Sequence, residues 1–229
     1  MPDKQLNLRE AIKLLKKHYG RPLPPATADP FELVLWENVA YLASPTRRRD
    51  AFAHLQETVG TTPAAILAAD KRALEQVTAR GILKGTFAAK LRECARIAIA
   101  EYDGDLVPVV RGPVAAAKKA LRAFPGIGEP GAEKILLFAG LQPLLAPDSN
   151  GLRVLVRIGL VPEEKSYART YAAAREAANT LPAKMDTMRD AHLLLAEHGR
   201  TLCKRSVPRC GVCPLAGGCA YARGGEPRV

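Results

Sequence analysis

The sequence predicts an all-α protein, and three observations carry that prediction. Alanine and leucine, which favour helices, are abundant, whereas aromatic residues make up only 5% of the 229 residues. Apolar residues recur at helical spacing along most of the chain. No pair of strands, internal repeat or low-complexity tract is recognisable. The length suffices for one large domain or for two small lobes that share a core.

The helices are predicted in order from this periodicity and from the positions of glycine and proline. The first covers Leu6–Tyr19 and stops at Gly20, and a proline-rich connection over 21–30 follows it. Further helices are expected over Pro30–Ser44, Asp50–Val59, Thr62–Ala68, Lys71–Val77, Gly85–Tyr102, Val114–Ala123, Gly131–Ala139, Leu152–Ile158, Tyr167–Leu181 and Met185–His198. Pro45 is expected to close the second helix, and the stretch 104–112 to be irregular.

The chain carries a formal net charge of +11. Such an excess attracts polyanions, of which nucleic acid is the commonest, although a charge that only keeps the protein dispersed in water is the alternative. The first twenty residues form an amphipathic pattern rather than a secretory signal, and no apolar run is long enough to span a bilayer. We therefore expect an intracellular protein of the cytoplasm, associated with the nucleoid and without a membrane partner.

Four of the five cysteines lie within 17 residues, with six, two and five residues between them. They are Cys203, Cys210, Cys213 and Cys219. A reducing compartment argues against disulfides, and thiolates so close in sequence can wrap a compact metal centre. Structural zinc is the alternative, but zinc sites usually pair two C-x-x-C knuckles and this stretch has one. The fifth cysteine, Cys94, lies mid-helix among apolar neighbours and is expected to be buried.

A tight turn with the sequence Phe-Pro-Gly-Ile-Gly occupies residues 124–128. Its two glycines permit the turn and leave backbone N–H groups exposed at the start of the next helix, near Gly131, where a phosphate can bind without a side-chain charge. An ordinary helix–helix turn is the alternative. The residues predicted to contact DNA are Pro125, Gly126, Ile127, Gly128, Gly131 and Lys134 here, and Lys204 and Arg205 in the basic stretch after the first clustered cysteine. For Lys134, a solvated position on the helix face is an equal alternative.

Several segments, in this order, resemble the endonuclease III and adenine-mismatch glycosylase superfamily. They are 29–33, Leu121–Phe138, the Pro-Asp-Ser-Asn run 147–150 with Arg153 and Val154, and His192–Cys219. The resemblance covers about residues 29–219. It implies a two-lobed, all-α helix-hairpin-helix DNA glycosylase fold with a C-terminal 4Fe–4S cluster loop. It also implies double-stranded DNA with a damaged or mispaired base as the partner, and flipping of that base out of the stack.

The resemblance also implies how the chain is divided. A helical barrel domain is expected over 29–147, with the helix-hairpin-helix at about 114–139. A second domain is expected to combine 1–28 with 148–229. It would hold the cluster loop 203–219, in which the four clustered cysteines bind the 4Fe–4S cluster. We expect a monomer.

Asp148 matches the family's catalytic aspartate. Breaking an N-glycosidic bond builds positive charge on the sugar, which a carboxylate stabilises while it orients the attacking water. The alternative is a helix cap, because a helical run follows. Glu37 falls where adenine-mismatch glycosylases place a glutamate that protonates the leaving purine; its alternative is a solvated or salt-bridged side chain. Tyr41, Asn38 and Asn150 are predicted pocket residues, and Tyr41 is expected either to stack on a base or to lie in the core.

The hairpin departs from the bifunctional members of the family at one position. Those enzymes carry a lysine at the second position after the last hairpin glycine, and its amine attacks C1′ of the sugar and leads to strand cleavage. Pro130 occupies that position. We therefore predict a monofunctional N-glycosylase, a hydrolase with weak or absent lyase activity. The alternatives are a lyase that uses another lysine such as Lys134, and a non-catalytic protein that binds lesions.

Two further departures concern the substrate. Tyr41 and Leu42 stand where both subfamilies carry glutamines. Because the sequence ends ten residues after Cys219, we expect the domain with which adenine-mismatch enzymes read the opposite base to be lacking. Neither a thymine glycol-type pyrimidine nor a mispaired adenine is therefore favoured as the substrate, and the lesion stays open.

Overall fold

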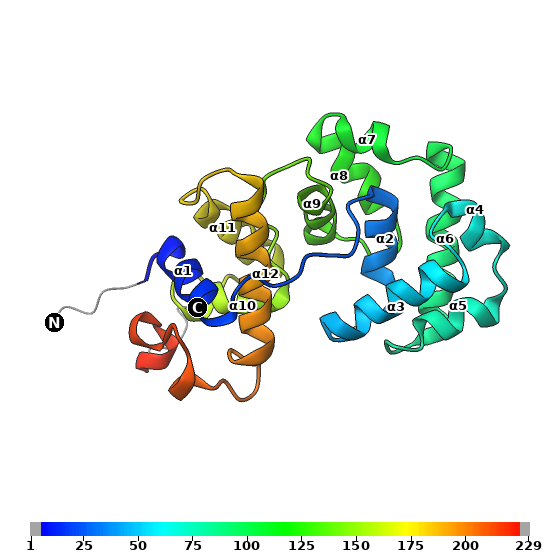
Figure 1. Ribbon diagram of the computed structural model, residues 1–229. Helices are drawn as coiled ribbons and strands as arrows, with labels where there is room; N and C mark the ends of the chain where they lie inside the picture. Colours follow the sequence, from blue (N-terminus) through cyan, green and yellow to red (C-terminus); the bar gives the residue numbers. More distant parts are fainter. Residues whose placement is uncertain (1–5, 225–229) are drawn as a thin grey trace. The chain divides into compact units, whose positions relative to one another are not determined.

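The computed structural model describes residues 6–224, and this part of the chain is helical throughout (Figure 1). Twelve α-helices and three short 3-10 helices follow one another, and no strand occurs among the described residues. The predicted all-α class is therefore confirmed. Between residues 6 and 224, no helix is long and apolar enough to cross a membrane. By its internal contacts the chain divides into two compact units.

The first unit, called the cysteine unit from here on, comprises the described parts of Met1–Pro24 and Gln142–Val229. Its elements are α1 (Leu8–Tyr19), α10 (Ser149–Arg157), α11 (Tyr167–Ala178), α12 (Met185–Thr201), η1 (Cys210–Val212), η2 (Ala216–Gly218) and η3 (Tyr221–Arg223). Helix α12 packs against both α10 and α1 (Figure 1). Leu15, Leu155 and Leu194, one from each of these helices, are fully buried, so segments far apart in sequence build one apolar core.

Helices α10 and α12 approach each other very closely at one point. A Cβ atom at Gly199 of α12 would lie 2.5 Å from the carbonyl oxygen of Asn150 in α10, so only glycine fits there. The last turn of α12 therefore rests on the first turn of α10. The clustered cysteines begin directly after α12, at Cys203, and this contact fixes where their loop starts.

The second unit, called the hairpin unit from here on, comprises Pro25–Leu141. Its helices are α2 (Pro30–Asn38), α3 (Pro45–Thr58), α4 (Pro63–Ala68), α5 (Lys71–Thr78), α6 (Lys84–Tyr102), α7 (Val107–Arg111), α8 (Val114–Arg122) and α9 (Glu129–Phe138). The 19-residue α6 packs against α2, α4 and α5, and its Leu91 is fully buried. Helices α8 and α9 contact each other and are joined by the turn 124–128.

The connection between α2 and α3 differs from the sequence prediction. Helix α2 ends at Asn38 rather than at Ser44, and the chain turns over residues 39–42. Pro45 begins α3 instead of closing a helix, and Ser44 is the N-cap of α3. Proline suits the first turn of a helix because the N–H that it lacks would have no partner there. The stretch 104–112, expected to be irregular, contains the short helix α7.

Two helices that carry predicted site residues also begin earlier than expected. Helix α9 begins at Glu129 rather than near Gly131, with Pro130 in its first turn. Helix α10 begins at Ser149 rather than at Leu152, directly after a capping aspartate. In both cases a residue suited to a helix start, proline in the first turn or aspartate at the N-cap, lies nearer the true boundary than the apolar periodicity does.

Candidate functional site

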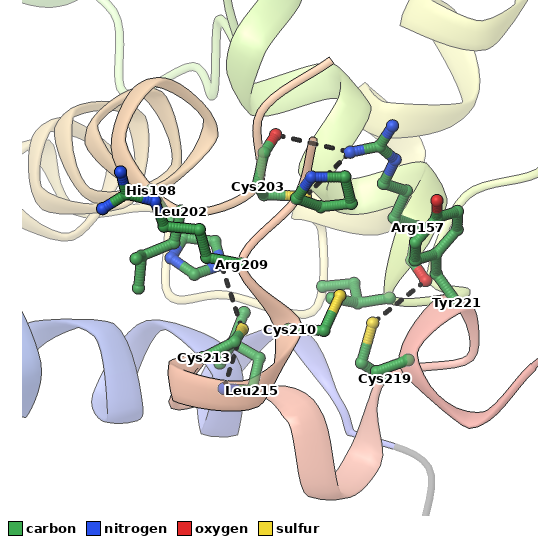
Figure 2. Close-up of a pocket in the computed structure, with 13 residues that line it drawn as sticks. Arg157, His198, Leu202, Cys203, Arg209, Cys210, Cys213, Leu215, Cys219 and Tyr221 are labelled. Atoms are coloured by element: carbon green, nitrogen blue, oxygen red, sulfur yellow. Dashed lines mark hydrogen bonds between the residues drawn. The ribbon is translucent and has the colours of Figure 1, made fainter. Parts of the chain in front are cut away.

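All four clustered cysteines line one pocket of the cysteine unit, together with side chains of α10 and α12 (Figure 2). Nitrogen atoms of the surrounding residues lie against two of the sulfur atoms. His198 Nε2 lies 3.4 Å from Cys213 Sγ, and the backbone N–H of Leu215 donates to the same sulfur at 3.4 Å. The Arg157 guanidinium donates to Cys203 Sγ at 3.6 Å. The thiols therefore face a common space in which N–H groups can stabilise sulfur in its charged form.

The electrostatics of the pocket depend on burial. Burial raises the pKa of the Cys213 and Cys219 thiols, and the charges of the neighbouring cysteines raise the pKa of both further. Burial also lowers the pKa of the His198 imidazole to about 4. Among residues 6–224, no group of three or more His, Cys, Asp or Glu side chains is arranged to hold a metal ion. Cys94 lies apart in α6, and burial raises its pKa to about 12, so the expectation of a buried thiol is confirmed.

The loop that follows Cys203 is held to α10 by two arginines. Arg153 Nε donates to the Cys203 carbonyl at 3.0 Å. Arg157 donates to the carbonyls of Lys204 at 2.6 Å and Arg205 at 3.0 Å. With these carbonyls turned toward α10, the side chains of Lys204 and Arg205 are exposed to solvent. The loop thus presents two cations on a backbone that α10 holds in place.

Asp148 is the N-cap of α10. Its Oδ1 accepts hydrogen bonds from the N–H groups of Asn150 at 3.0 Å and Gly151 at 2.8 Å. Asn150 is fixed in turn, because its Oδ1 accepts from Arg153 at 2.9 Å. Burial, and next the charge of Asp148, raise the pKa of the Tyr167 phenol, so this carboxylate acts electrostatically on its surroundings. The capping role considered from the sequence is present, and it orients the carboxylate at the helix start.

The turn 124–128 has the geometry of a tight hairpin. Gly126 adopts φ +80°, in the left-handed region where glycine is favoured, and its backbone is exposed. Ile127 is buried, and Gly131 lies against it, since a Cβ at Gly131 would be 3.4 Å from the Ile127 side chain. Gly128 is the N-cap of α9 without any side-chain hydrogen bond. The first turn of α9 therefore keeps backbone N–H groups available to an anion.

Glu37 and Lys134 form an ion pair between α2 and α9. Lys134 Nζ lies 2.5 Å from Glu37 Oε2, and Arg48 lies 3.9 Å from Glu37 Oε1. The two side chains of the close pair are mostly buried, with 15% of Glu37 and 18% of Lys134 exposed. Of the readings considered for Glu37 from the sequence, the salt-bridged glutamate is the arrangement present in this structure.

The other two predicted pocket residues of the hairpin unit have partners of their own. Asn38 is 1% exposed, and its Nδ2 donates to the carbonyl of Pro125 at 3.0 Å. Tyr41 is partly exposed and stacks on Phe87, with ring centroids 4.5 Å apart and planes inclined by 16°. Asn38 therefore lies under the hairpin, and the Tyr41 ring is packed against another aromatic side chain.

The predicted site residues are divided between the two units. Asp148, Asn150, Lys204, Arg205 and the four cysteines belong to the cysteine unit. Glu37, Asn38, Tyr41, Lys134 and the hairpin residues belong to the hairpin unit. Each unit therefore contains one of the two predicted DNA-contacting segments and one of the two candidate catalytic carboxylates.

Comparison with known proteins identifies the relatives of this chain. No protein-family model matches it. Endonuclease III of Escherichia coli is 28% identical over 194 residues, which cover 85% of each chain. An adenine DNA glycosylase of Mycobacterium tuberculosis is 31% identical over 142 residues, which cover 61% of this chain and 43% of that protein. The fold matches that of endonuclease III in a non-covalent DNA complex with a TM-score of 0.76, at 21% identity over 95% of both chains.

These relatives and structural neighbours support the endonuclease III-like superfamily as the one that this chain resembles. The predicted resemblance is therefore confirmed, and the all-helical architecture is that of an endonuclease III-like DNA glycosylase. Matches at 85% of each length align the endonuclease III relative with both units of this chain.

The sequence marked Leu42 only as a departure from the family's glutamines, and it did not predict that Leu42 and Leu83 form a pair of exposed leucines. Leu42 and Leu83 both have φ of 55°, in the left-handed region, and 72% and 60% of their surfaces are exposed. Their loops lie side by side, because Ile82 N–H donates to the Tyr41 carbonyl at 3.1 Å. A Cβ at Gly81 would lie 2.5 Å from the Tyr41 nitrogen, so glycine is needed for this approach. These leucines lower stability in two ways, through a disfavoured backbone conformation and through apolar surface exposed to water. This indicates that they serve function rather than stability.

Proposed function

We propose that this protein is a monofunctional DNA glycosylase that hydrolyses the N-glycosidic bond of a damaged or mispaired base in double-stranded DNA. The observation that carries the proposal is the Asp148 carboxylate, fixed at the N-terminus of α10 by two backbone N–H groups. The sequence resemblance matches this residue to the catalytic aspartate of the superfamily. The glycosylase names of the relatives support the reaction class, and the net charge of +11 supports a polyanionic substrate.

DNA binding is proposed at two segments, the hairpin 124–128 and the loop after Cys203. The hairpin offers N–H groups at an uncapped helix start, and the loop after Cys203 offers the exposed side chains of Lys204 and Arg205. Contacts of both kinds go to phosphates and position a protein on the duplex without reading the sequence. They suit an enzyme that must scan many base pairs for one lesion.

The exposed leucines supply a wedge for base flipping. A base inside the stack cannot be reached for chemistry on its glycosidic bond, and extrusion leaves a gap in the duplex. Apolar side chains inserted between base steps hold such a gap open. Leu42 and Leu83 project from two loops tied by the Ile82–Tyr41 hydrogen bond, so the pair can act as one rigid element.

In the reaction, the sugar gains positive charge as its bond to the base breaks. We propose that the Asp148 carboxylate stabilises this charge and orients the water that adds to C1′. Its capping bonds from Asn150 and Gly151 hold it in place before the substrate arrives, so little reorganisation accompanies the step. Asn150, held by Arg153, is proposed to line the same part of the pocket.

The absence of lyase chemistry is proposed from two features of α9. Pro130 has no amine, and it lies in the first turn where the family's bifunctional members carry lysine. Lys134, the alternative nucleophile, is paired with Glu37. Its amine is therefore engaged by a carboxylate rather than free to attack C1′. Glu37, the predicted general acid, is paired with Lys134 and lies near Arg48 in this structure. That role stays a prediction, and Glu37→Gln tests it.

A 4Fe–4S cluster on Cys203, Cys210, Cys213 and Cys219 is proposed as the cofactor. The donor set fits such a group in its chemistry, because four thiols line one pocket and N–H donors lie against the sulfurs of Cys203 and Cys213. The described side chains are not arranged as a metal site in this structure. When bound, the cluster would supply a structural cross-link for a loop of 3-10 turns. The four ligands would then fix the stretch that carries Lys204 and Arg205. Purified protein should be yellow-brown, whereas colourless protein with stoichiometric zinc contradicts the cluster.

The test of the proposed activity is a panel of duplexes, each with a different lesion, scored separately for base loss and for strand nicking. Wild-type protein should release one class of base and nick only after alkali. Asp148→Asn should lower release by about 10³-fold or more. Because asparagine caps a helix as well as aspartate does, α10 and DNA binding should survive this substitution.

The same panel decides between the proposal and its two rivals. Release that persists in Asp148→Asn contradicts the catalytic assignment. Tight lesion binding without release by wild-type protein identifies a non-catalytic lesion-binding protein. A borohydride-trapped adduct on abasic DNA that is lost in Lys134→Gln identifies a lyase.

A further inference from the structure

Asn38 occupies an unusual position for an amide side chain. It lies at the end of α2, is 1% exposed, and donates from Nδ2 to the carbonyls of Val34 at 3.1 Å and Pro125 at 3.0 Å. The first bond stays within α2, whereas the second crosses 87 residues of sequence to the hairpin. Its Oδ1 is buried without a hydrogen-bond partner in the described part of the chain.

The unpartnered oxygen lies against the hairpin glycine. A Cβ at Gly126 would be 2.6 Å from Asn38 Oδ1, so the amide fills the space that any other side chain at position 126 would need. Gly126 also has φ +80°, which disfavours other residues. Asn38 and Gly126 are therefore a matched pair, and each restricts what the other position accepts.

A buried, unpaired oxygen lowers stability, and an apolar side chain of similar size would avoid that loss. Leucine at position 38 would fill the same volume but could not bind the Pro125 carbonyl. The amide is therefore best explained by what its donor does to the hairpin.

That donor sets the direction of one peptide group. The peptide between Pro125 and Gly126 is trans, so its carbonyl and its N–H point in opposite directions. Because the Pro125 carbonyl points inward to Asn38, the Gly126 N–H points away from α2, at a residue whose backbone is exposed. The inward bond thus orients an outward donor.

We infer that Asn38 is a positioning residue that presents the Gly126 N–H to a phosphate of the DNA backbone. The inference rests on the proposed DNA-binding role of the hairpin, and it assigns to Asn38 a part in binding rather than in contact with the flipped base. The contact adds no charge to the interface. Its loss should therefore lower affinity without changing the dependence of affinity on salt.

The test compares Asn38→Leu with Thr78→Val. Thr78 is also 1% exposed, and its hydroxyl donates to the carbonyls of Leu74 at 3.0 Å and Lys84 at 2.8 Å, in the hairpin unit but away from the hairpin. Asn38→Leu should weaken binding of a lesion-free duplex roughly ten-fold. The slope of log Kd against log salt and the single-turnover rate at saturating lesion DNA should not change. Thr78→Val should bind like wild-type protein.

Thermal unfolding of both variants separates positioning from stability. If Asn38→Leu and Thr78→Val lose comparable stability and bind DNA equally well, the inference is overturned. It is also overturned if the single-turnover rate falls while Kd is kept. Binding is measured on undamaged duplex, so the result for Asn38 holds even if no lesion is ever excised. A failure of this inference can therefore be told apart from a failure of the proposed glycosylase activity.

A second pair of variants tests the match between the two residues. Gly126→Ala should weaken DNA binding, because its Cβ collides with Asn38 Oδ1. Adding Asn38→Ala makes room for that Cβ but removes the donor. The backbone strain of alanine at φ +80° stays, so the double variant should regain only part of the lost stability, and it should not regain affinity. Full recovery of affinity in the double variant contradicts the positioning role.

Discussion

The hairpin is held from inside by one neutral amide, whereas the cysteine loop is held by two guanidinium groups. In both regions a side chain on a neighbouring helix binds backbone carbonyls and leaves the outer face for a partner. Asn38 of α2 does this for Pro125. Arg153 and Arg157 of α10 do it for the loop from Cys203 onward. Both segments proposed to contact DNA phosphates are thus held by side-chain donors that bind backbone carbonyls. The donor is a neutral amide in one and a charged guanidinium in the other.

The difference lies in charge and burial. The Asn38 amide is buried, so its bond is little affected by salt or by competing water. Several of the Arg157 contacts are exposed to solvent, and they carry a charge that salt screens. The conformation of the hairpin should therefore depend little on salt concentration. The cysteine loop should depend on its ligands and on ionic strength.

The largest expected effect comes from removing the guanidinium of Arg157. This residue donates to the carbonyls of Lys204 and Arg205 and to Cys203 Sγ, and its guanidinium lies 4.7 Å from the centre of the Tyr221 ring. Arg157→Gln should accelerate loss of the visible cluster absorption under a chelator by about ten-fold or more, because the loop loses several contacts at once.

Arg96→Gln is the matched control for Arg157→Gln. Arg96 pairs with Glu93 on an exposed face of α6, and its removal should leave the cluster unaffected. The hairpin variant Asn38→Leu should likewise keep the cluster. If Arg157→Gln loses its absorption no faster than Arg96→Gln, the arginines do not hold the loop, and the comparison between the two regions fails.

The two regions also differ in how far the sequence predicted them. The cysteine pocket is predicted by the spacing of the cysteines, because four thiols within 17 residues of sequence lie close together in space. The hairpin turn is anticipated by its glycines. The role of Asn38 is not, since its partner Pro125 lies 87 residues away and no local pattern reports such a contact. The pairing of Glu37 with Lys134 escaped prediction for the same reason.

Helix existence was predicted better than helix ends. Apolar periodicity reports which residues face a core, and it located eleven of the twelve α-helices. It continues through the turn after Asn38, however, because apolar residues there pack in the turn as they would in a helix. Leu42 in the left-handed region was unpredictable, since leucine disfavours that conformation and only the neighbouring loop over 81–83 explains it.

That strained leucine gives the second prediction, in which stability and activity change in opposite directions. Leu42 is 72% exposed with φ 55°, so glycine there relieves strain and removes little buried surface. Leu42→Gly should raise the free energy of unfolding by about 1 kcal/mol. It should also slow base release from a paired lesion several-fold, because the wedge is smaller. Thermal unfolding and single-turnover kinetics measure the two effects.

Leu23→Gly is the control for Leu42→Gly. Leu23 is 75% exposed but does not have positive φ, so glycine there should not stabilise the protein. Leu42→Gly should act normally on a lesion that is already unpaired, since no stack has to be opened. Equal slowing on paired and unpaired lesions would exclude the wedge and leave Leu42 with some other contact to the substrate.

The smallest expected effect concerns a carboxylate beside the hairpin. Glu129 lies in the first turn of α9, is 35% exposed, and pairs with Lys118 and with Arg122, the latter at 3.2 Å. It neutralises two cations next to the proposed phosphate site. Glu129→Gln should therefore tighten DNA binding about two- to three-fold. It should also steepen the slope of log Kd against log salt by up to about the amount that one phosphate contact contributes.

Glu93→Gln is the control, because it removes the same charge from α6 and should change neither the affinity nor the slope. Tighter binding in Glu129→Gln with an unchanged salt slope would mean that the carboxylate acts on the shape of the hairpin rather than on its charge. The hairpin would then depend on charged neighbours as the cysteine loop does, and the contrast between the two regions would disappear.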